Sequence, residues 1–404
     1  MASRCTSAGT VDGGGRGDGA VQTWYEQVYA NARGASFDLS VLERCLIAGR
    51  AIVFYARTLV WPSDLMFINP RWSVNANEAW QYGFPGLVIG VGALLAWIAR
   101  RRRGPLAVFL IYTGSLFPTL GFLNINWFNY SFVADHFQYV ASLGLIVPVA
   151  NLATQIAQRR KQATARIAAT LTGSLLVAVL ALLSWRQSGH YRDSETFYRQ
   201  ALAQNPASWI AHHNLGATLL DRPDRLDEAI SHLATVLTLK PNHLRAHINL
   251  GHAFSRIPGR VPEAIKAFEG ALRLDPKNYR VLTHLAQTFA QMPDGMTEAI
   301  ATYRRALEVN PRGWEAHAGL AHLLAATPDT RAEAFAMFSA AIELQPADAA
   351  LRNDFGGYLA SLGRGQEAIG AFEAAVRIQP AYAEAHYNLG TLLADTPGRL
   401  DEAI

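Results

Sequence analysis

Polar side chains recur at one position of a repeated pattern in the second half of the chain, and this arrangement is suited to binding a peptide backbone. In each unit this position is followed by a leucine or phenylalanine and then by a small residue, glycine or alanine. It is occupied by Asn214, Asn249, His284, Asp354 and Asn388, with Gly319 in the fourth unit. A carboxamide donates and accepts hydrogen bonds at once, so a row of such groups can hold an extended peptide by its main chain. These five side chains are therefore candidate peptide-binding residues. Local hydrogen bonding inside the repeats is the alternative interpretation.

A second candidate site lies in the apolar stretch from Leu42 to Trp61. Glu43, Arg50 and Arg57 recur there every seven residues, so on a helix they form one charged stripe. A lipid-facing arginine at mid-membrane is costly. The stripe must therefore lie in the membrane interface with snorkelling arginines, or face protein, water or a lipid phosphate.

The aromatic-rich segment 124–139 contains one acid beside one histidine, Asp135 and His136. One interpretation is an aromatic belt with a solvated turn at a membrane surface. The other is a polar site in which these two side chains, with Arg50 and Arg57, contact a lipid phosphate or head group.

The sequence gives no basis for assigning catalytic residues or a metal site. No spacing matches a zinc site, a nucleophile elbow, a phosphate loop or a dinucleotide fingerprint. Four histidines precede the small residue of their units by four positions: His212, His247, His317 and His386. Helices that pack side by side lie about 10 Å apart, too far for shared zinc coordination, so we expect these histidines to pack or to line a surface. The net charge of +4 owes much to two short basic segments, and no nucleic-acid partner is expected.

The second half is organised by a fixed period. Prolines recur at intervals of 35 or 34 residues, namely Pro206, Pro241, Pro276, Pro311, Pro346 and Pro380. Small residues follow ten positions later at Gly216, Gly251, Ala286, Ala321, Gly356 and Gly390, and a second set stands at Ala229, Ala264, Ala299, Ala334, Ala368 and Ala403. Such a period predicts stacked helical hairpins, hence an all-α solenoid over 188–404 with a half-repeat, five repeats and a truncated last repeat. Because no polar terminal cap follows, we expect the sequence to be a fragment at its C-terminus.

The first half is rich in long apolar segments. Four are long enough to cross a bilayer, namely Trp80 to Ala99, Pro105 to Phe122, Phe137 to Ala157 and Ile167 to Trp185. The basic segments 100–103 and 159–161 then lie in the cytoplasm by the positive-inside rule, which places the repeats outside. We thus expect a disordered leader over 1–36, an interfacial or re-entrant helix with an outward loop over 37–79, and a four-span transmembrane domain over 80–187. The expected location is the bacterial inner membrane, with the repeats in the periplasm and membrane lipid as one partner.

These patterns resemble known families. The period, small residues and terminal proline of each unit resemble the tetratricopeptide repeat. The segments Leu46 to Ala51, Leu59 to Pro62, Phe67 to Trp72 and Ser131 to Tyr139, followed by such repeats, resemble bacterial transmembrane-and-tetratricopeptide-repeat proteins. Those are similar to eukaryotic transmembrane O-mannosyltransferases with luminal repeats. The asparagine row resembles the ladder in the repeats of O-GlcNAc transferase.

The resemblance implies a function without fixing a catalytic residue. It implies a polyprenyl-phosphate sugar donor near Arg50, Arg57 and Asp135, and a concave repeat groove that presents a protein acceptor. The acidic residues that such enzymes carry in their first outward loop have no counterpart in this sequence. The chain is therefore expected to be a membrane-anchored peptide-binding part of a protein O-glycosyltransferase-like protein. The alternative is a non-catalytic, membrane-tethered scaffold for envelope protein assembly.

Overall fold

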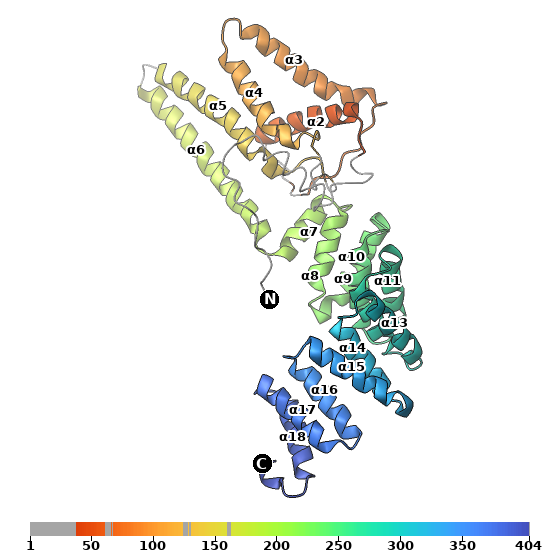
Figure 1. The fold of residues 1–404 in the computed structure, drawn as a ribbon. Coiled ribbons are helices and arrows are strands. Elements are labelled where there is room, and N and C mark those ends of the chain that lie inside the picture. Colours follow the sequence, from red (N-terminus) through yellow and green to blue (C-terminus); the bar gives the residue numbers. More distant parts are fainter. Residues whose placement is uncertain are drawn as a thin grey trace, which may run out of the picture. The chain divides into compact units, whose positions relative to one another are not determined.

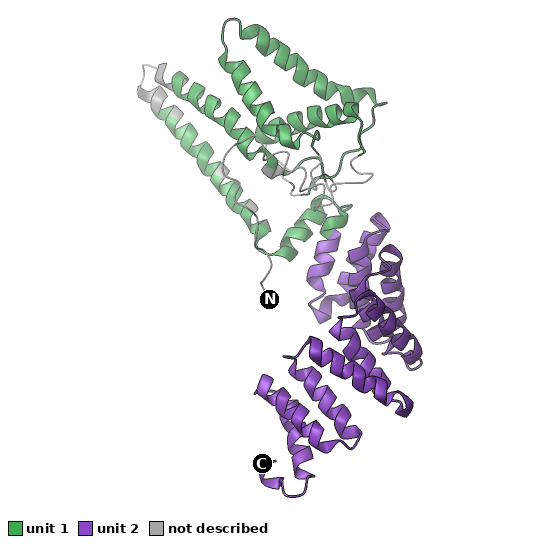
Figure 2. Cartoon of the chain, in the orientation of Figure 1, with its two compact units in different colours: residues 1–211 green, residues 212–404 purple. Residues whose placement is uncertain are grey.

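The computed structural model describes residues 38–60, 66, 68–123, 128, 131–159 and 163–403, and every regular element in this part is a helix. The expected leader over 1–36 lies outside the described residues. The chain divides into two compact units, residues 1–211 and 212–404, and each is considered by itself (Figure 2).

Unit 1 contains the apolar segments predicted to span a membrane, each as a helix (Figure 1). Its helices are α2 (Val41–Val60), η2 (Ala79–Tyr82), α3 (Gly83–Ile98), α4 (Gly104–Leu116), η3 (Phe117–Thr119), η5 (Asp135–Gln138), α5 (Tyr139–Arg159), α6 (Ala163–Ser188), η6 (Gly189–Tyr191) and α7 (Ser194–Gln204). The Ser40 and Glu43 side chains start α2 by bonding each other's backbone N–H groups, at 3.3 Å and 2.8 Å. This reciprocal cap satisfies two N–H groups that a helix end leaves unpaired.

The core of unit 1 joins α2 and α4 to the segment 131–134. Tyr55 on α2 is fully buried, and its hydroxyl accepts a hydrogen bond from the Ala134 N–H at 3.1 Å. The Tyr112 hydroxyl on α4 donates to the Ile52 carbonyl at 3.1 Å. Two buried phenols thus hold the loop and α4 against the same turns of α2.

The remaining faces of these helices expose large apolar side chains. Ile89 on α3, Val147 on α5 and Leu175 on α6 are 71%, 61% and 66% exposed. Among the described residues, one helical segment, Ala79–Ile98, is both long and apolar enough to cross a membrane. The other three predicted spans coincide with shorter apolar helical segments, Gly104–Thr119, Tyr139–Gln155 and Thr170–Arg186. The predicted four-span domain is therefore not confirmed.

The repeats form antiparallel helix pairs (Figure 1). The half-repeat is α7, and the later helices are α8 (Trp209–Leu219), η7 (Pro223–Arg225), α9 (Leu226–Leu239), α10 (Leu244–Ser255), α11 (Val261–Leu274), α12 (Tyr279–Phe289), α13 (Met296–Val309), α14 (Trp314–Ala325), η8 (Pro328–Thr330), α15 (Arg331–Leu344), α16 (Ala349–Ser361), α17 (Gly365–Ile378), α18 (Ala383–Ala394) and η9 (Leu400–Glu402). The expected start of a last second helix is thus only the short 3-10 turn η9.

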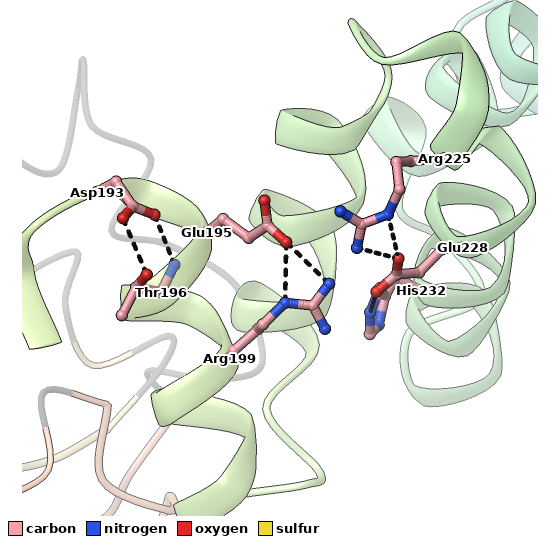
Figure 3. Close-up of polar contacts among 7 residues, drawn as sticks. All are labelled: Asp193, Glu195, Thr196, Arg199, Arg225, Glu228 and His232. Atoms are coloured by element: carbon pink, nitrogen blue, oxygen red, sulfur yellow. Dashed lines mark hydrogen bonds and ion pairs between the residues drawn. The ribbon is translucent and has the colours of Figure 1, made fainter.

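Polar groups fix the ends of the first repeat helices (Figure 3). The Asp193 carboxylate caps α7 by accepting from the Thr196 N–H at 2.8 Å, and Glu195 pairs with Arg199 one turn on at 2.9 Å. Arg225 pairs with Glu228 in the first turn of α9. An acid near a helix N-terminus complements the helix dipole as well as its unpaired N–H groups.

The two compact units divide at 211/212, whereas the expected start of the repeat domain at 188 stays a prediction. Ile68, from the segment after α2, packs with Ala201 on α7 and Ala211 on α8 in one buried cluster. The Asn205 side chain, just past α7, also donates to the Ile68 carbonyl at 3.4 Å. Because α7 packs on this segment, it belongs to unit 1 and the boundary falls at 211/212.

The small residues bring the two helices of each hairpin together, as the period predicts. A Cβ atom on Gly251 of α10 would lie 2.5 Å from the Phe268 ring of α11. One on Gly356 of α16 would lie 2.7 Å from Phe372 of α17. Since real Cβ contacts are longer than this, α10 and α16 accept the aromatic ring of the second helix because glycine stands at these positions.

Candidate peptide-binding face

The candidate peptide-binding residues share one position on the first helices of successive repeats. Asn214, Asn249, His284, Gly319, Asp354 and Asn388 lie on α8, α10, α12, α14, α16 and α18, and all are half-buried. We call the surface formed by these six positions the ladder face. Each residue directly precedes the leucine or phenylalanine of its unit and lies two positions before the small residue.

Contacts between repeats show that the ladder face is continuous at its C-terminal end. His322 on α14 donates from Nε2 to Asp354 Oδ2 on α16 at 3.1 Å. Asn388 on α18 donates from Nδ2 to Asn353 Oδ1 on α16 at 2.9 Å. Two of the five candidate side chains thus bond to the preceding repeat, in line with the alternative of local hydrogen bonding.

At the centre of the ladder face, His284 is held by ring contacts. Its ring lies perpendicular to that of His252 on α10, with centroids 4.3 Å apart, and is stacked on Phe268 at 6.1 Å. Burial lowers the pKa of His252 to about 4, with a smaller contribution from His284. Burial also lowers the pKa of His284. Both rings are therefore neutral at pH 7 and can exchange hydrogen bonds with a ligand.

The ladder is interrupted at Gly319 for a steric reason. A Cβ atom there would lie 2.3 Å from the Tyr303 ring of α13, which fills the space that a side chain would occupy. Tyr303 is buried, and burial raises its pKa to about 12, so the phenol stays neutral. An aromatic residue on the second helix thus sets where the row of polar side chains breaks.

Asn214 and Asn249 differ from the other ladder residues because their carboxamides are available. Neither side chain forms a hydrogen bond with any residue that the structure describes, although both are half-buried. They lie at equivalent positions of two successive first helices, α8 and α10. Each amide can therefore offer one donor and one acceptor to the backbone of a bound chain.

The four histidines that lie four positions before the small residue of their units form contacts within the repeats. His247, His317 and His386 each donate from Nε2 to the carbonyl of the proline six residues earlier, at 3.1, 3.0 and 2.9 Å. His212 instead meets His232 of α9, with their Nδ1 atoms 2.9 Å apart. Each of the three donating histidines ties its first helix to the proline that ends the preceding unit. Over the residues with described positions, no group of three or more His, Cys, Asp or Glu side chains is arranged to hold a metal ion.

Sequence reasoning missed a second histidine pair, His213 and His243. Their ring centroids lie 4.7 Å apart, and His243 caps α10 by accepting from the Ala246 N–H at 3.1 Å through Nδ1. Burial, followed by the charges of His213 and Lys240, lowers the pKa of His243 to about 4. The signal was present in the sequence, since His243 occupies the position where Asn278 and Asp348 cap later first helices.

The three charged residues of the stripe on α2 have different surroundings. Glu43 belongs to the cap with Ser40, and Arg57 is exposed. The Arg50 guanidinium lies over the Trp72 ring, 4.3 Å from its centroid, with Trp80 at 5.5 Å. Arg50 is thus engaged by aromatic faces from the segment after α2.

The other two candidates of this site cannot be placed. Asp135 and His136 lie on η5, and their side chains are outside the described part. A lipid-phosphate site shared by these two residues with Arg50 and Arg57 stays a prediction.

Comparison with known families decides the class of the second half. A family model described as tetratricopeptide repeat matches residues 181–243, 217–279, 296–349 and 353–404, together about half of the chain. The chain belongs to the tetratricopeptide-repeat family. The predicted helical-repeat solenoid is confirmed.

One curated relative carries an enzyme's name. The repeat protein is 30% identical over 125 residues to "Protein O-mannosyl-transferase Tmtc2" of Drosophila melanogaster, a match over 31% of this chain and 13% of that protein. The chain thus matches only a small part of that relative's length.

Solved structures share the helical-repeat fold. YrrB, titled a TPR protein with an unusual peptide-binding site, is 23% identical, with a TM-score of 0.37 over 46% of this chain and 95% of its own. A thermophilic TPR protein of Thermus thermophilus, TTC0263, is 20% identical, with a TM-score of 0.38 over 46% of this chain and 98% of its own. PilF of Pseudomonas aeruginosa is 19% identical, with a TM-score of 0.42 over 48% of this chain and 86% of its own. At these identities the likeness concerns the fold and not the ligand.

Proposed function

We propose that this tetratricopeptide-repeat protein is tethered to a membrane and holds an extended protein segment on its ladder face. The observation that carries the proposal is the pair Asn214 and Asn249, at equivalent positions of successive first helices, with no bonding partner in the described part of the chain. A half-buried amide without a partner is stabilised when a ligand supplies one. An extended segment offers backbone N–H and C=O groups in a regular row, which is what two aligned amides can pair with.

The membrane tether is supported by the surface of unit 1. The segment Ala79–Ile98 meets the length and composition of a span, and α3 has no buried residue. Each exposed leucine or isoleucine on α3, α5 and α6 would cost about 1.5–3 kcal/mol in water relative to an apolar surrounding. Such a density of exposed apolar side chains is typical of a membrane-facing surface. The arginines at 100–103 lie directly after the span and favour the cytoplasmic side. We propose that the shorter apolar segments Gly104–Thr119, Tyr139–Gln155 and Thr170–Arg186 make three further crossings, after which the repeats lie in the periplasm.

A role in protein O-glycosylation is the finer part of the proposal. It rests on the local similarity to a protein named an O-mannosyl-transferase. In such a role the ladder face presents an acceptor protein, whose hydroxyl attacks the sugar of a polyprenyl-phosphate donor held by other parts of the protein. Of the candidate lipid-phosphate residues, Arg57 has a described and exposed side chain on α2 and could contact such a phosphate.

A non-catalytic scaffold is the second candidate, and the setting of Arg50 favours it. This guanidinium lies over Trp72 and near Phe84, so it serves packing in unit 1. A scaffold would use the same ladder face to recruit envelope proteins without transferring a sugar. Transfer of labelled mannose from a polyprenyl-phosphate donor to an acceptor peptide by the purified chain would exclude the scaffold.

Peptide capture is tested with the full chain in lipid nanodiscs and a fluorescent extended peptide of Ser, Ala and Gln. The Asn214→Ala/Asn249→Ala variant is expected to weaken binding about tenfold, because each amide contributes about 0.5–1.5 kcal/mol. Asn310→Ala is the control away from the ladder positions, since this residue ends α13 and its side chain accepts from the Arg312 N–H. It is expected to lower stability and leave binding within about twofold. Equal binding by wild type and the double variant would refute the proposal.

A further inference from the structure

We propose that the part of the ladder face formed by α10 and α12 binds an acidic stretch of the extended segment. The inference rests on the proposed function and names the chemistry of its ligand. It goes beyond backbone recognition, because it concerns the side chains that the bound segment must carry.

The first helices change charge along the ladder face. α10 contains Arg245 and α12 contains Arg280, and neither helix contains Asp or Glu. α14 contains Glu315 and α18 contains Glu384, and neither contains Lys or Arg. The face is therefore basic over α10 and α12 and acidic over α14 and α18.

The two arginines lie beside the ladder residues. Arg245 precedes Asn249 by four residues and Arg280 precedes His284 by four, so each pair shares one face of its helix. After burial, the charge of Arg245 is the next cause that lowers the pKa of His213. Burial and the charge of Arg280 likewise lower the pKa of His284. The Arg280 charge thus reaches the ladder residue His284, where Glu315 acts in the opposite direction, and the Arg245 charge reaches His213, the neighbour of Asn214.

Arg245 and Arg280 are also without an acidic partner. Both are exposed, and neither forms an ion pair or a hydrogen bond with a described residue. By contrast, five other arginines of the repeats are each paired with a glutamate, namely Arg225, Arg260, Arg304, Arg364 and Arg399. An arginine without an acidic partner among the described residues therefore stands four positions before Asn249 and before His284.

An acidic peptide fits this combination best. A guanidinium binds a carboxylate with two parallel hydrogen bonds, and the neighbouring carboxamide binds a peptide backbone. A phospholipid surface or a nucleic acid offers phosphates but no regular row of amides. The charges and the amide thus select a protein segment that carries Asp or Glu.

The test compares three fluorescent peptides of one length and backbone, with four Glu, four Gln or four Lys, on the full chain in neutral-lipid nanodiscs at low salt. The Glu peptide is expected to bind about tenfold more tightly than the Gln peptide, and the Lys peptide more weakly than either. Arg245→Gln/Arg280→Gln is expected to abolish the Glu advantage. Arg352→Gln/Arg377→Gln removes the same charge elsewhere and is expected to preserve it, since Arg352 bonds the Pro346 carbonyl and Arg377 lies on α17.

Each outcome separates this inference from the proposed function. If the Gln peptide binds and the Glu peptide binds no better, the acidic preference is wrong while peptide capture stands. If Arg245→Gln/Arg280→Gln still binds the Glu peptide more tightly than the Gln peptide, the acidic side chains are bound elsewhere and the proposal is overturned. Anionic vesicles that displace the Glu peptide from wild type but not from the double variant would identify a lipid surface as the ligand instead. If no peptide binds, the proposed function itself fails.

Discussion

The imidazole rings of His252 and His284 meet edge to face across two successive repeats, with centroids 4.3 Å apart. Both side chains lie at the contact between α10 and α12, next to the Phe268 ring. Burial keeps both rings neutral by lowering each pKa, that of His252 to about 4. A proton added to either ring would place a positive charge in partly buried surroundings, and at His284 the charge of Arg280 opposes it further. The stability of this contact therefore depends on pH.

The free energy of unfolding should therefore fall as the pH drops from about 6.5 towards 4. In this window the unfolded histidines, with pKa values near 6.5, take up protons that the folded chain excludes. Because both rings are partly exposed, the loss is on the order of 1–2 kcal/mol for the pair. Urea unfolding of the full chain, followed by hydrogen exchange in α10 and α12, measures the difference between pH 7.5 and pH 5.

The control for this prediction is His252→Gln/His284→Gln. The variant keeps polar side chains on the two helices but removes the protons, so its stability should vary less with pH than that of the wild type. The free energy of unfolding of the variant should still change somewhat with pH, because the pKa values of His213 and His243 are also lowered. Identical pH slopes for the two proteins would contradict the account.

The close approach within each hairpin predicts opposite effects for two glycine substitutions. Gly251→Ala places a methyl group 2.5 Å from the Phe268 ring and should cost about 1–3 kcal/mol. Gly370→Ala on α17 meets nothing within 4 Å and should stabilise the protein by about 0.5–1 kcal/mol. Chemical unfolding by circular dichroism compares the two. A stable Gly251→Ala protein would show that α10 and α11 do not pack as described.

In unit 1, Gly49 permits the contact between α2 and α3. A Cβ atom there would lie 2.5 Å from the Pro85 nitrogen, whereas one at Gly90 would meet nothing within 4 Å. Gly49→Ala should therefore lower the thermal unfolding temperature of the full chain in nanodiscs, and Gly90→Ala should not. The loss is expected to be about 1–3 kcal/mol, because backbone atoms must move apart. Tryptophan fluorescence can follow the thermal unfolding, since the rings of Trp72 and Trp80 contact Arg50 on α2. No difference between the variants would argue against this helix contact.

The proposed topology predicts a one-sided protease pattern. In sealed vesicles of known orientation, trypsin should cut the repeats only from the periplasmic side, because three proposed crossings follow the cytoplasmic arginines at 100–103. A tag after Arg103 should show the reverse accessibility and serves as the internal control. Cleavage of the repeats from the cytoplasmic side would overturn the orientation.

The repeat architecture could be predicted from the sequence because it depends on a period. Small residues such as Gly251 and the large residue four positions beyond each second small one are visible in the chain, and helical packing converts their spacing into contacts. The partners of the ladder residues could not be predicted in this way. Whether Asn388 bonds Asn353 or a ligand depends on distances between side chains of different repeats.

The first half was harder to predict for a related physical reason. The heptad spacing of Glu43, Arg50 and Arg57 places them on one stripe, but their partners come from outside the helix. Ser40 engages Glu43 and the distant Trp72 engages Arg50. A helix pattern defines the face on which a charge lies, whereas the tertiary fold defines what covers that face.

The most direct test of the central claim is to locate a bound peptide on the repeats. A photo-crosslinking residue is placed at Gln287, exposed on α12 one turn after His284, or at Ala301, exposed on the second helix α13. With the neutral extended peptide and the full chain in nanodiscs, the account predicts strong crosslinking at Gln287 and little at Ala301. Strong crosslinking at Ala301 with none at Gln287 would show that the ladder face is not where this protein holds its ligand.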